Sequence, residues 1–366
     1  IGSISYKNLI NDVQIGTSIL VNDGLIELKA EKIDDTDIVC RVINGGIISD
    51  RKAINVPGVH LSLPFLSDVD RRDLEFAMKT GFDFFALSFV RCAEDVLEVR
   101  RLQKEHNNTS KLIAKIESQE GVENLDAIID VADGIMVARG DMGVEIPFEK
   151  VPVVQKDMIS KCLKSGKFVI VATQMLESMT HNPRPTRAEV NDVANAIFDQ
   201  TSAVMLSGES AAGDYPVEAV KTMSRICHEI EKTTTTGKFE ITYNGSNLAS
   251  SIACAACSIA SVINADAIIP VSLSGSTIRK VSGFRPNIAI IGCSTNECVC
   301  RETSLMWGVT PVLITEQADG EALINEVISK CKTAGVIKSG NRVVIVAGFP
   351  LRIAGATNMI RVVDVE

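Results

Sequence analysis

The sequence has 366 residues, 46% of them apolar, and this length predicts two or three domains at roughly 100–200 residues each. Its 37 basic and 46 acidic residues give a net charge of −9, which argues against nucleic acid as a partner because phosphate backbones call for a basic face. No apolar run reaches the roughly 18 residues of a membrane span, so we expect no membrane partner either.

Ten cysteines in a chain of this length are too sparse for a disulfide framework, and no signal-peptide pattern is present. We therefore expect a reducing, cytoplasmic setting. The chain begins at Ile1 rather than methionine, inside a strand-rich segment, and we expect that a part of the protein precedes it.

Three segments with different patterns follow one another. In residues 1–55, short alternating runs surround an Asn22-Asp23-Gly24 turn, and Asn and Gly there accept the positive φ of a hairpin. This segment predicts a small antiparallel β domain.

Residues 56–237 alternate apolar runs with amphipathic stretches, which predicts βαβ units and a parallel sheet. Five strands are expected, and a closed (β/α)8 barrel needs eight, so the barrel is incomplete in this chain. The expected strands are Phe82–Val90, Lys111–Glu117, Gly134–Asp141, Lys167–Thr173 and Ser202–Ser207, with helices such as Asp68–Thr80, Ala93–Glu105 and Asn124–Val131.

Residues 238–366 predict a second α/β domain with an open sheet. A polar stretch, Lys238–Ser246, is expected to be a linker, and a helix follows over Ser246–Asn264. The expected strands are Ala267–Leu273, Ile288–Cys293, Thr310–Ile314, Arg342–Ala347 and a terminal Ile360–Val365.

Lys115 and Glu117 end a predicted strand and, with a side-chain period of two, point to the same side. In a barrel, residues at the C-terminal ends of the strands face the active site. A cation beside a carboxylate suits a metal–phosphate site, while a plain strand-end salt bridge is the alternative.

Gly140 and Asp141 follow the next strand, where a Gly-rich corner opens a helix. Glycine lets a ligand approach the backbone, and N–H groups at a helix start bind anions. Asp141 and Glu117, from adjacent strand ends, are a pair that can share a divalent cation. An ordinary Gly-rich turn is the alternative reading.

Two more strand ends belong to the same rim. Thr173 follows its strand and either binds a substrate or caps a helix. Gly208–Gly213 has the glycine spacing of a phosphate loop but lacks the lysine and hydroxyl of a Walker motif.

In the last domain, clustered hydroxyls end a strand and open a helix, which favours either phosphate binding or ordinary helix capping. The residues concerned are Ser272, Ser274, Gly275 and Thr277. The pair Cys254 and Cys257 has redox spacing but lies in a small-residue helical run, so we expect buried structural thiols.

The longest motifs resemble the pyruvate kinase family, and the similarity runs from about Ser5 to the C-terminus. They are KIESQEG at 115–121, IMVARGDMGVEIP at 135–147, TQMLESM at 173–179, PRPTRAE at 183–189 and VMLSGESAAG at 204–213.

The resemblance implies a TIM-type (β/α)8 barrel with a small β-barrel lid and a C-terminal α/β regulatory domain. It implies transfer of phosphate from phosphoenolpyruvate to ADP, giving pyruvate and ATP, with Mg²⁺ or Mn²⁺ and, in many members, K⁺. It also suggests a homotetramer. The family's first three barrel strands, the front of its lid and its K⁺ ligands have no counterpart in this chain.

Carried over by motif, Glu117 and Asp141 bind the metal and Lys115 stabilises the phosphoryl group. Gly140, Asp141 and Thr173 receive the substrate carboxylate. The remaining positions are Ser207 and Glu209 for enolate protonation, Asp23 and Lys52 of the lid for metal and nucleotide, and Ser272, Ser274, Gly275 and Thr277 for an effector phosphate.

Leu273 and Ser276 stand where some members have basic residues, so we expect weaker phosphate binding or a different effector. Two other functions stay open. One is an inactive fragment or degenerate homologue that acts as a regulatory subunit, and the other is a Mg²⁺-dependent lyase of the phosphoenolpyruvate/pyruvate type.

Overall fold

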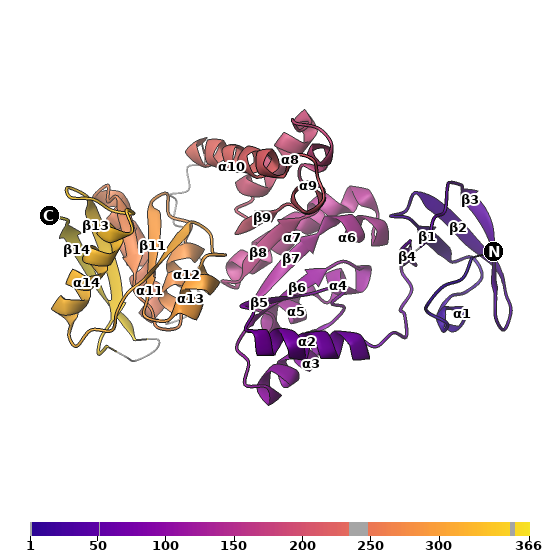
Figure 1. Ribbon diagram of the computed structural model, residues 1–366, viewed down its shortest axis with the longest axis horizontal. Helices are drawn as coiled ribbons and strands as arrows, with labels where there is room; N and C mark the ends of the chain where they lie inside the picture. The colour runs from indigo at the N-terminus through magenta and orange to yellow at the C-terminus, as the bar shows by residue number, and fades with distance from the viewer. Residues whose placement is uncertain (1, 51, 234–247, 352–355) are drawn as a thin grey trace. The chain divides into compact units, whose positions relative to one another are not determined.

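The computed structural model describes residues 2–50, 52–233, 248–351 and 356–366 (Figure 1). The chain divides into two compact units, one of Ile1–Asp192 with Val204–Lys221 and the other of Val193–Ala203 with Thr222–Glu366. The expected linker, Lys238–Ser246, and the domain boundary at 237–238 lie outside the described residues.

The N-terminal residues form a four-stranded sheet in the order β3-β2-β1-β4. Its β1–β2 hairpin turns at Asn22 and Asp23, both with φ of 55°, and at Gly24 with φ of 81°, as the Asn-Asp-Gly turn predicts. A small core of Leu9, Val13, Ile19 and Val56 packs beneath it. The elements are α1 (Leu9–Asp12), β1 (Ser18–Val21), β2 (Ile26–Ile33), β3 (Ile38–Asn44) and β4 (Ile54–Asn55).

The second sheet has the five predicted strands in sequence order, β5-β6-β7-β8-β9. The pairs from β5 to β8 are parallel, and β7 is buried at every position, which is typical of a sheet covered on both faces. The strands are β5 (Phe84–Leu87), β6 (Lys111–Ile116), β7 (Gly134–Ala138), β8 (Phe168–Ala172) and β9 (Ala203–Met205). Among the described residues this sheet does not close into a barrel.

One helix of this region, α2 (Asp68–Thr80), begins at a capping box. Ser67 accepts the Asp70 N–H and the Asp70 carboxylate accepts the Ser67 N–H, so a capping box starts α2. The helices are α2 (Asp68–Thr80), α3 (Ala93–Glu105), α4 (Gln119–Glu123), α5 (Leu125–Val131), α6 (Arg139–Glu145), α7 (Val151–Lys164), α8 (Arg187–Phe198), α9 (Gly208–Ala211) and α10 (Pro216–Thr233), with short 3-10 turns at Phe148–Lys150 and Glu177–Thr180.

The C-terminal sheet has the order β12-β11-β10-β13-β14, and its last strand is antiparallel to β13. It is the open sheet that the sequence predicts, and the antiparallel β14 makes it mixed. Its strands are β10 (Ala267–Pro270), β11 (Ala289–Ser294), β12 (Val309–Leu313), β13 (Arg342–Gly348) and β14 (Thr357–Asp364), and its helices are α11 (Leu248–Val262), α12 (Ser276–Gly283), α13 (Glu297–Thr303) and α14 (Gly320–Thr333).

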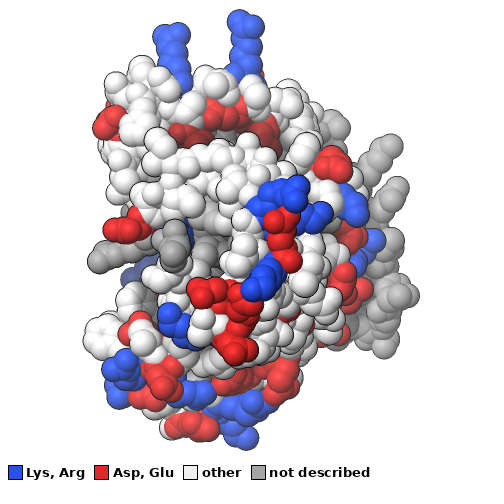
Figure 2. Space-filling model, turned by 90° about the vertical axis from the view of Figure 1, so that its right-hand side faces the viewer, with Lys and Arg blue, Asp and Glu red and all other residues white. Residues whose placement is uncertain are grey.

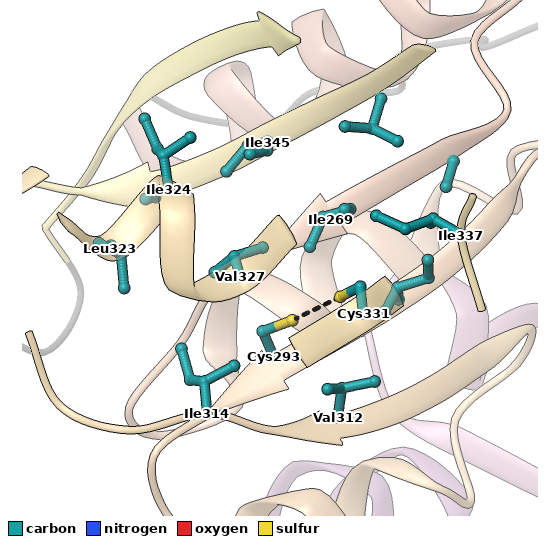
Figure 3. Close-up of a cluster of buried hydrophobic side chains, with 14 of the residues drawn as sticks. Ile269, Cys293, Val312, Ile314, Leu323, Ile324, Val327, Cys331, Ile337 and Ile345 are labelled. Atoms are coloured by element: carbon teal, nitrogen blue, oxygen red, sulfur yellow. Dashed lines mark hydrogen bonds between the residues drawn. The ribbon is translucent and has the colours of Figure 1, made fainter. Parts of the chain in front are cut away.

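The two faces of this sheet bury different clusters because successive strand side chains point to opposite sides. Ile269 and Ile345 pack against Val327 of α14 on one face (Figure 3). Ile268 and Val344 pack with residues of α11 on the other. The domain is therefore a three-layer α/β sandwich.

All ten cysteines are free thiols. Cys254 and Cys257 are both buried on α11, and burial raises the pKa of the Cys257 thiol to about 12. Such thiols are unreactive, as expected from their sequence setting. No helix among the described residues combines the length and apolarity that a membrane crossing requires.

Candidate active site at the strand ends

Five predicted site residues lie at or just after the C-terminal ends of neighbouring strands. Lys115 is in β6 and Glu117 directly follows it, Gly140 and Asp141 open α6 after β7, and Thr173 follows β8. Since β5 to β8 run parallel, these residues share one edge of the sheet.

Lys115 and Glu117 form the tightest pair at this edge. The Lys115 Nζ lies 2.8 Å from the Glu117 Oε1 and donates to the Ser88 Oγ, also at 2.8 Å. The other carboxylate oxygen, Oε2, accepts the Phe89 N–H at 2.5 Å. The Glu117 side chain is 1% exposed and that of Lys115 is 24% exposed, so one carboxylate is fixed in place while the ammonium still reaches solvent.

Burial raises the pKa of Glu117, and the Lys115 ammonium and the Phe89 N–H oppose this effect. The negative charge of Asp141 raises the same pKa further. The two carboxylates therefore repel each other across adjacent strand ends, and a cation between them relieves this repulsion.

The residues present suit a magnesium ion. No group of three or more His, Cys, Asp and Glu side chains at metal-binding geometry occurs within the described part of the chain. Mg²⁺ commonly takes only one or two carboxylates and completes its octahedron with water and substrate phosphates. Glu117 and Asp141 supply that donor set.

Thr173 links the corners after β7 and β8. Its Oγ1 accepts the Gly140 N–H at 2.7 Å and donates to the Ala172 carbonyl at 2.6 Å. Thr173 and Gln174 have φ of 68° and 51°, a left-handed conformation that costs energy in non-glycine residues and occurs at functional sites. The Thr173 hydroxyl thus caps the first turn of α6, the helix after the neighbouring strand, rather than a helix that follows its own strand.

A buried arginine, which the sequence analysis did not assign to the site, supports this corner. Arg139 donates twice to Asp192, at 2.7 and 2.6 Å, and once to the Thr173 carbonyl at 2.6 Å. Its side chain is 10% exposed. The sequence analysis did not assign Ser88 to the site either. Its position directly after β5 is the signal that could have identified it, because residues at the C-terminal ends of barrel strands face the active site.

Ser207 and Glu209 lie after β9, and Glu209 is fully buried. Its Oε1 accepts the Leu176 N–H at 2.9 Å and its Oε2 accepts the Ser207 N–H at 2.8 Å. Glu209 thus holds the loop that presents Ser207. Both oxygens are engaged by the backbone, which favours a supporting role over direct proton transfer.

Asp23 and Lys52, which the sequence predicts to belong to a lid, are both exposed. The turn that contains Asp23 lies near α6, because a Cβ on Gly24 would stand 3.7 Å from the Val144 Cγ1. Asn55 of β4 also donates to the Glu145 Oε1 at 2.9 Å.

A cavity of about 1220 Å³ opens beside this edge of the sheet. Its lining includes Ser88, Ser118 and Asp141 from the strand ends and Val56 and His60 from the segment after β4. A cavity of this size holds a nucleotide-sized ligand.

Three of the four predicted effector residues, Ser272, Ser274 and Thr277, line a small pocket of about 70 Å³ in the C-terminal sheet domain, and Gly275 does not. Ser272 and Thr277 are buried, Ser274 is exposed, and Gly275 has φ of 76° at the start of α12. Among the described residues that line this pocket, Glu316 is the charged one.

The surface charges are mixed. On the face shown in Figure 2, lysines and arginines are interspersed with aspartates and glutamates. With a net charge of −9, such a face gives no basic surface for a phosphate backbone.

Residues 1–220 match the family model for the pyruvate kinase barrel domain, and 250–363 match the model for the pyruvate kinase alpha/beta domain. The chain belongs to the pyruvate kinase family. It is 46% identical to the pyruvate kinase of Clostridium acetobutylicum, over 100% of this chain and 78% of that protein.

The pyruvate kinases of Staphylococcus aureus strains MRSA252 and USA300 are also each 46% identical, over 98% of this chain. The chain spans 62% of the length of these two relatives. Its fold agrees with membership of the pyruvate kinase family, because the described residues hold part of a parallel barrel sheet and a complete open α/β sheet.

Proposed function

We propose that this chain acts as a pyruvate kinase, which transfers a phosphoryl group from phosphoenolpyruvate to ADP. The observation that carries the proposal is the 2.8 Å pair of Lys115 and the buried Glu117, with Asp141 close enough to perturb the pKa of Glu117. Phosphoryl transfer depends mostly on positioning and charge neutralisation, and this arrangement supplies both.

Glu117 and Asp141 would hold Mg²⁺ or Mn²⁺, which neutralises charge on the phosphate oxygens when bound. Lys115 has a second role beside them. Its ammonium is anchored by Glu117 and Ser88 yet remains 24% exposed, so it can follow the phosphoryl group as its charge shifts between donor and acceptor.

The substrate carboxylate would bind at the first turn of α6. The backbone N–H groups of a helix start attract anions, and Gly140 admits a ligand close to the backbone. Thr173 already fixes this turn through the Gly140 N–H, so the turn is preorganised before substrate arrives.

The enolpyruvate that remains after transfer must be protonated at carbon. Ser207, held by Glu209 through its N–H, is placed on the same rim and would relay a proton from water. Glu209 then serves as a support rather than as the acid.

The proposal also covers the lid, the effector pocket, the oligomeric state and the cellular location. Asp23 and Lys52 would approach metal and nucleotide when the lid is over the site, and the pocket at Ser272–Thr277 would bind an effector. A homotetramer, a cytoplasmic location and a K⁺ requirement follow from the family likeness alone.

One assay separates the three functions. The complete protein is incubated with phosphoenolpyruvate and Mg²⁺, with and without ADP, and pyruvate and ATP are followed. Turnover that requires ADP and yields both products supports the kinase. Turnover without ADP would favour the lyase, and no turnover in either case would favour the regulatory subunit.

A further inference from the structure

Arg285 is a buried cation outside the site described above. The residue is 6% exposed and has φ of 50° just after α12. Burial lowers its pKa to about 10, so it is charged at neutral pH. Within the described part of the chain no carboxylate pairs with it, and its Nε has no hydrogen-bond partner. A buried charge without a counter-ion is costly, so its retention calls for a specific role.

The guanidinium group joins three separate segments. Its Nη1 donates to the Ser282 carbonyl at 3.0 Å. Its Nη2 donates to the Gln200 carbonyl at 3.3 Å and to the Ser202 Oγ at 3.0 Å. Its Cζ lies 5.3 Å from the centroid of the Trp307 ring, and this stacking stabilises the cation.

The segment that Arg285 holds leads directly into the catalytic rim. Gln200–Ser202 precede β9 (Ala203–Met205), and Ser207 follows two residues after that strand. Gln200 has φ of 66°, a left-handed conformation that non-glycine residues adopt less readily. Local backbone hydrogen bonds from the Gln200 and Thr201 N–H groups to the Ile197 and Ala196 carbonyls cap the end of α8. The Gln200 carbonyl itself accepts from Arg285, which ties this helix end to a second segment.

We propose that Arg285 is a positioning residue for the catalytic rim. By fixing Gln200–Ser202 it fixes where β9 begins, and so where Ser207 is presented. The catalytic half of this inference rests on the proposed kinase function. Lysine is a poor substitute for arginine here, because its ammonium is a compact point charge without the planar fork of donors and the flat face that stacks on a ring.

The test is Arg285→Lys in the complete protein, read by hydrogen–deuterium exchange and by kinetics. We expect faster amide exchange in residues 199–209, with unchanged exchange in 111–116. We also expect kcat to fall roughly 10–100-fold, with KM for phosphoenolpyruvate within about twofold. Exchange of the pyruvate methyl protons in D₂O, the reverse of enolate protonation, is expected to fall in parallel with kcat.

Two further variants serve as a milder test of the same contact and as a control. Ser202→Ala removes the hydroxyl that accepts from Arg285 and is expected to give a smaller change in the same direction, even if Arg285→Lys folds poorly. Arg361→Lys alters an arginine of the same unit that is 42% exposed and pairs with Glu321, and it should change neither readout.

Unchanged exchange in 199–209, or a kcat loss no larger than the unfolded fraction of the variant, would overturn the inference. A wild-type protein without turnover would instead overturn the proposed function. Amide exchange in 199–209 does not depend on turnover and would still decide whether Arg285 holds the segment.

Discussion

The Thr173 Oγ1 accepts the Gly140 N–H at 2.7 Å, so a side chain after β8 fixes the first turn of the helix that follows β7. A Cβ added to Gly140 would stand 3.4 Å from the same Oγ1. The loop after β7 and the loop after β8 are therefore in van der Waals contact at this point. The place where the substrate carboxylate is proposed to bind is therefore set by a contact between neighbouring strand ends.

Thr173→Val tests this contact, because it keeps the shape of the side chain and removes the hydroxyl. We expect kcat/KM for phosphoenolpyruvate to fall about 10²-fold. Thr173→Ser retains the hydroxyl and should keep activity within about tenfold of wild type. If the valine and serine variants are equally active, the hydroxyl does not set the site.

Glu117→Gln tests the metal site without reference to turnover. Replacing the buried carboxylate removes half of the charged donor set, so Mn²⁺ affinity measured by electron paramagnetic resonance is expected to weaken about tenfold or more. Glu94→Gln changes an exposed carboxylate on α3 that pairs with Arg101, and it serves as the matched control. Equal Mn²⁺ affinity in both variants would place the metal elsewhere.

Glu189 gives a pH-dependent prediction. Burial alone would raise the pKa of Glu189, but hydrogen bonds from Ser178 and Thr186 outweigh it and lower the pKa below its ordinary 4.5. A lowered pKa in the folded state stabilises the protein above pH 4.5, and this stabilisation is lost as the pH falls through the folded value.

Glu189→Gln should therefore lower the thermal midpoint by about 2 °C at pH 7, and the difference should shrink as the pH falls below 4.5. The measurement is calorimetry of both proteins across this pH range, with Glu177→Gln at an exposed position as the control. A difference that grows toward low pH would refute the assigned hydrogen bonds.

The buried thiols are expected to be inert. Burial raises the pKa of Cys162 and of Cys257 to about 12, and the thiolate is the reactive form. Iodoacetamide at pH 8, followed by mass spectrometry, should label neither residue in the native protein and both after unfolding. Native labelling of Cys257 would revive a redox function for the Cys254–Cys257 pair.

Much of the fold could be predicted from local pattern. The alternation of apolar runs and helices predicted the strands β5 to β9 in order, and the helix expected over Asp68–Thr80 is α2. The sequence also predicted that Lys115 and Glu117 lie side by side. Alternate side chains of a strand point the same way, and this local rule needs only a few residues of sequence.

Contacts between distant segments could not be predicted in this way. Arg139 reaches Asp192 across 53 positions, and Arg285 reaches Ser202 across 83. The sequence showed Arg139 only as part of a Gly-rich corner, and Arg285 stood in no motif. Their roles depend on tertiary packing, which no local periodicity encodes.

The most direct test of the kinase proposal is ATP formation from phosphoenolpyruvate and ADP by Lys115→Met in the complete protein, with circular dichroism to check folding. Lys111→Met, at the other end of β6, is the control. If Lys115 stabilises the phosphoryl group, the Lys115 variant folds normally and forms ATP about 10³-fold more slowly or worse, while the control stays near the wild-type rate. Near-normal ATP formation by Lys115→Met would contradict this account.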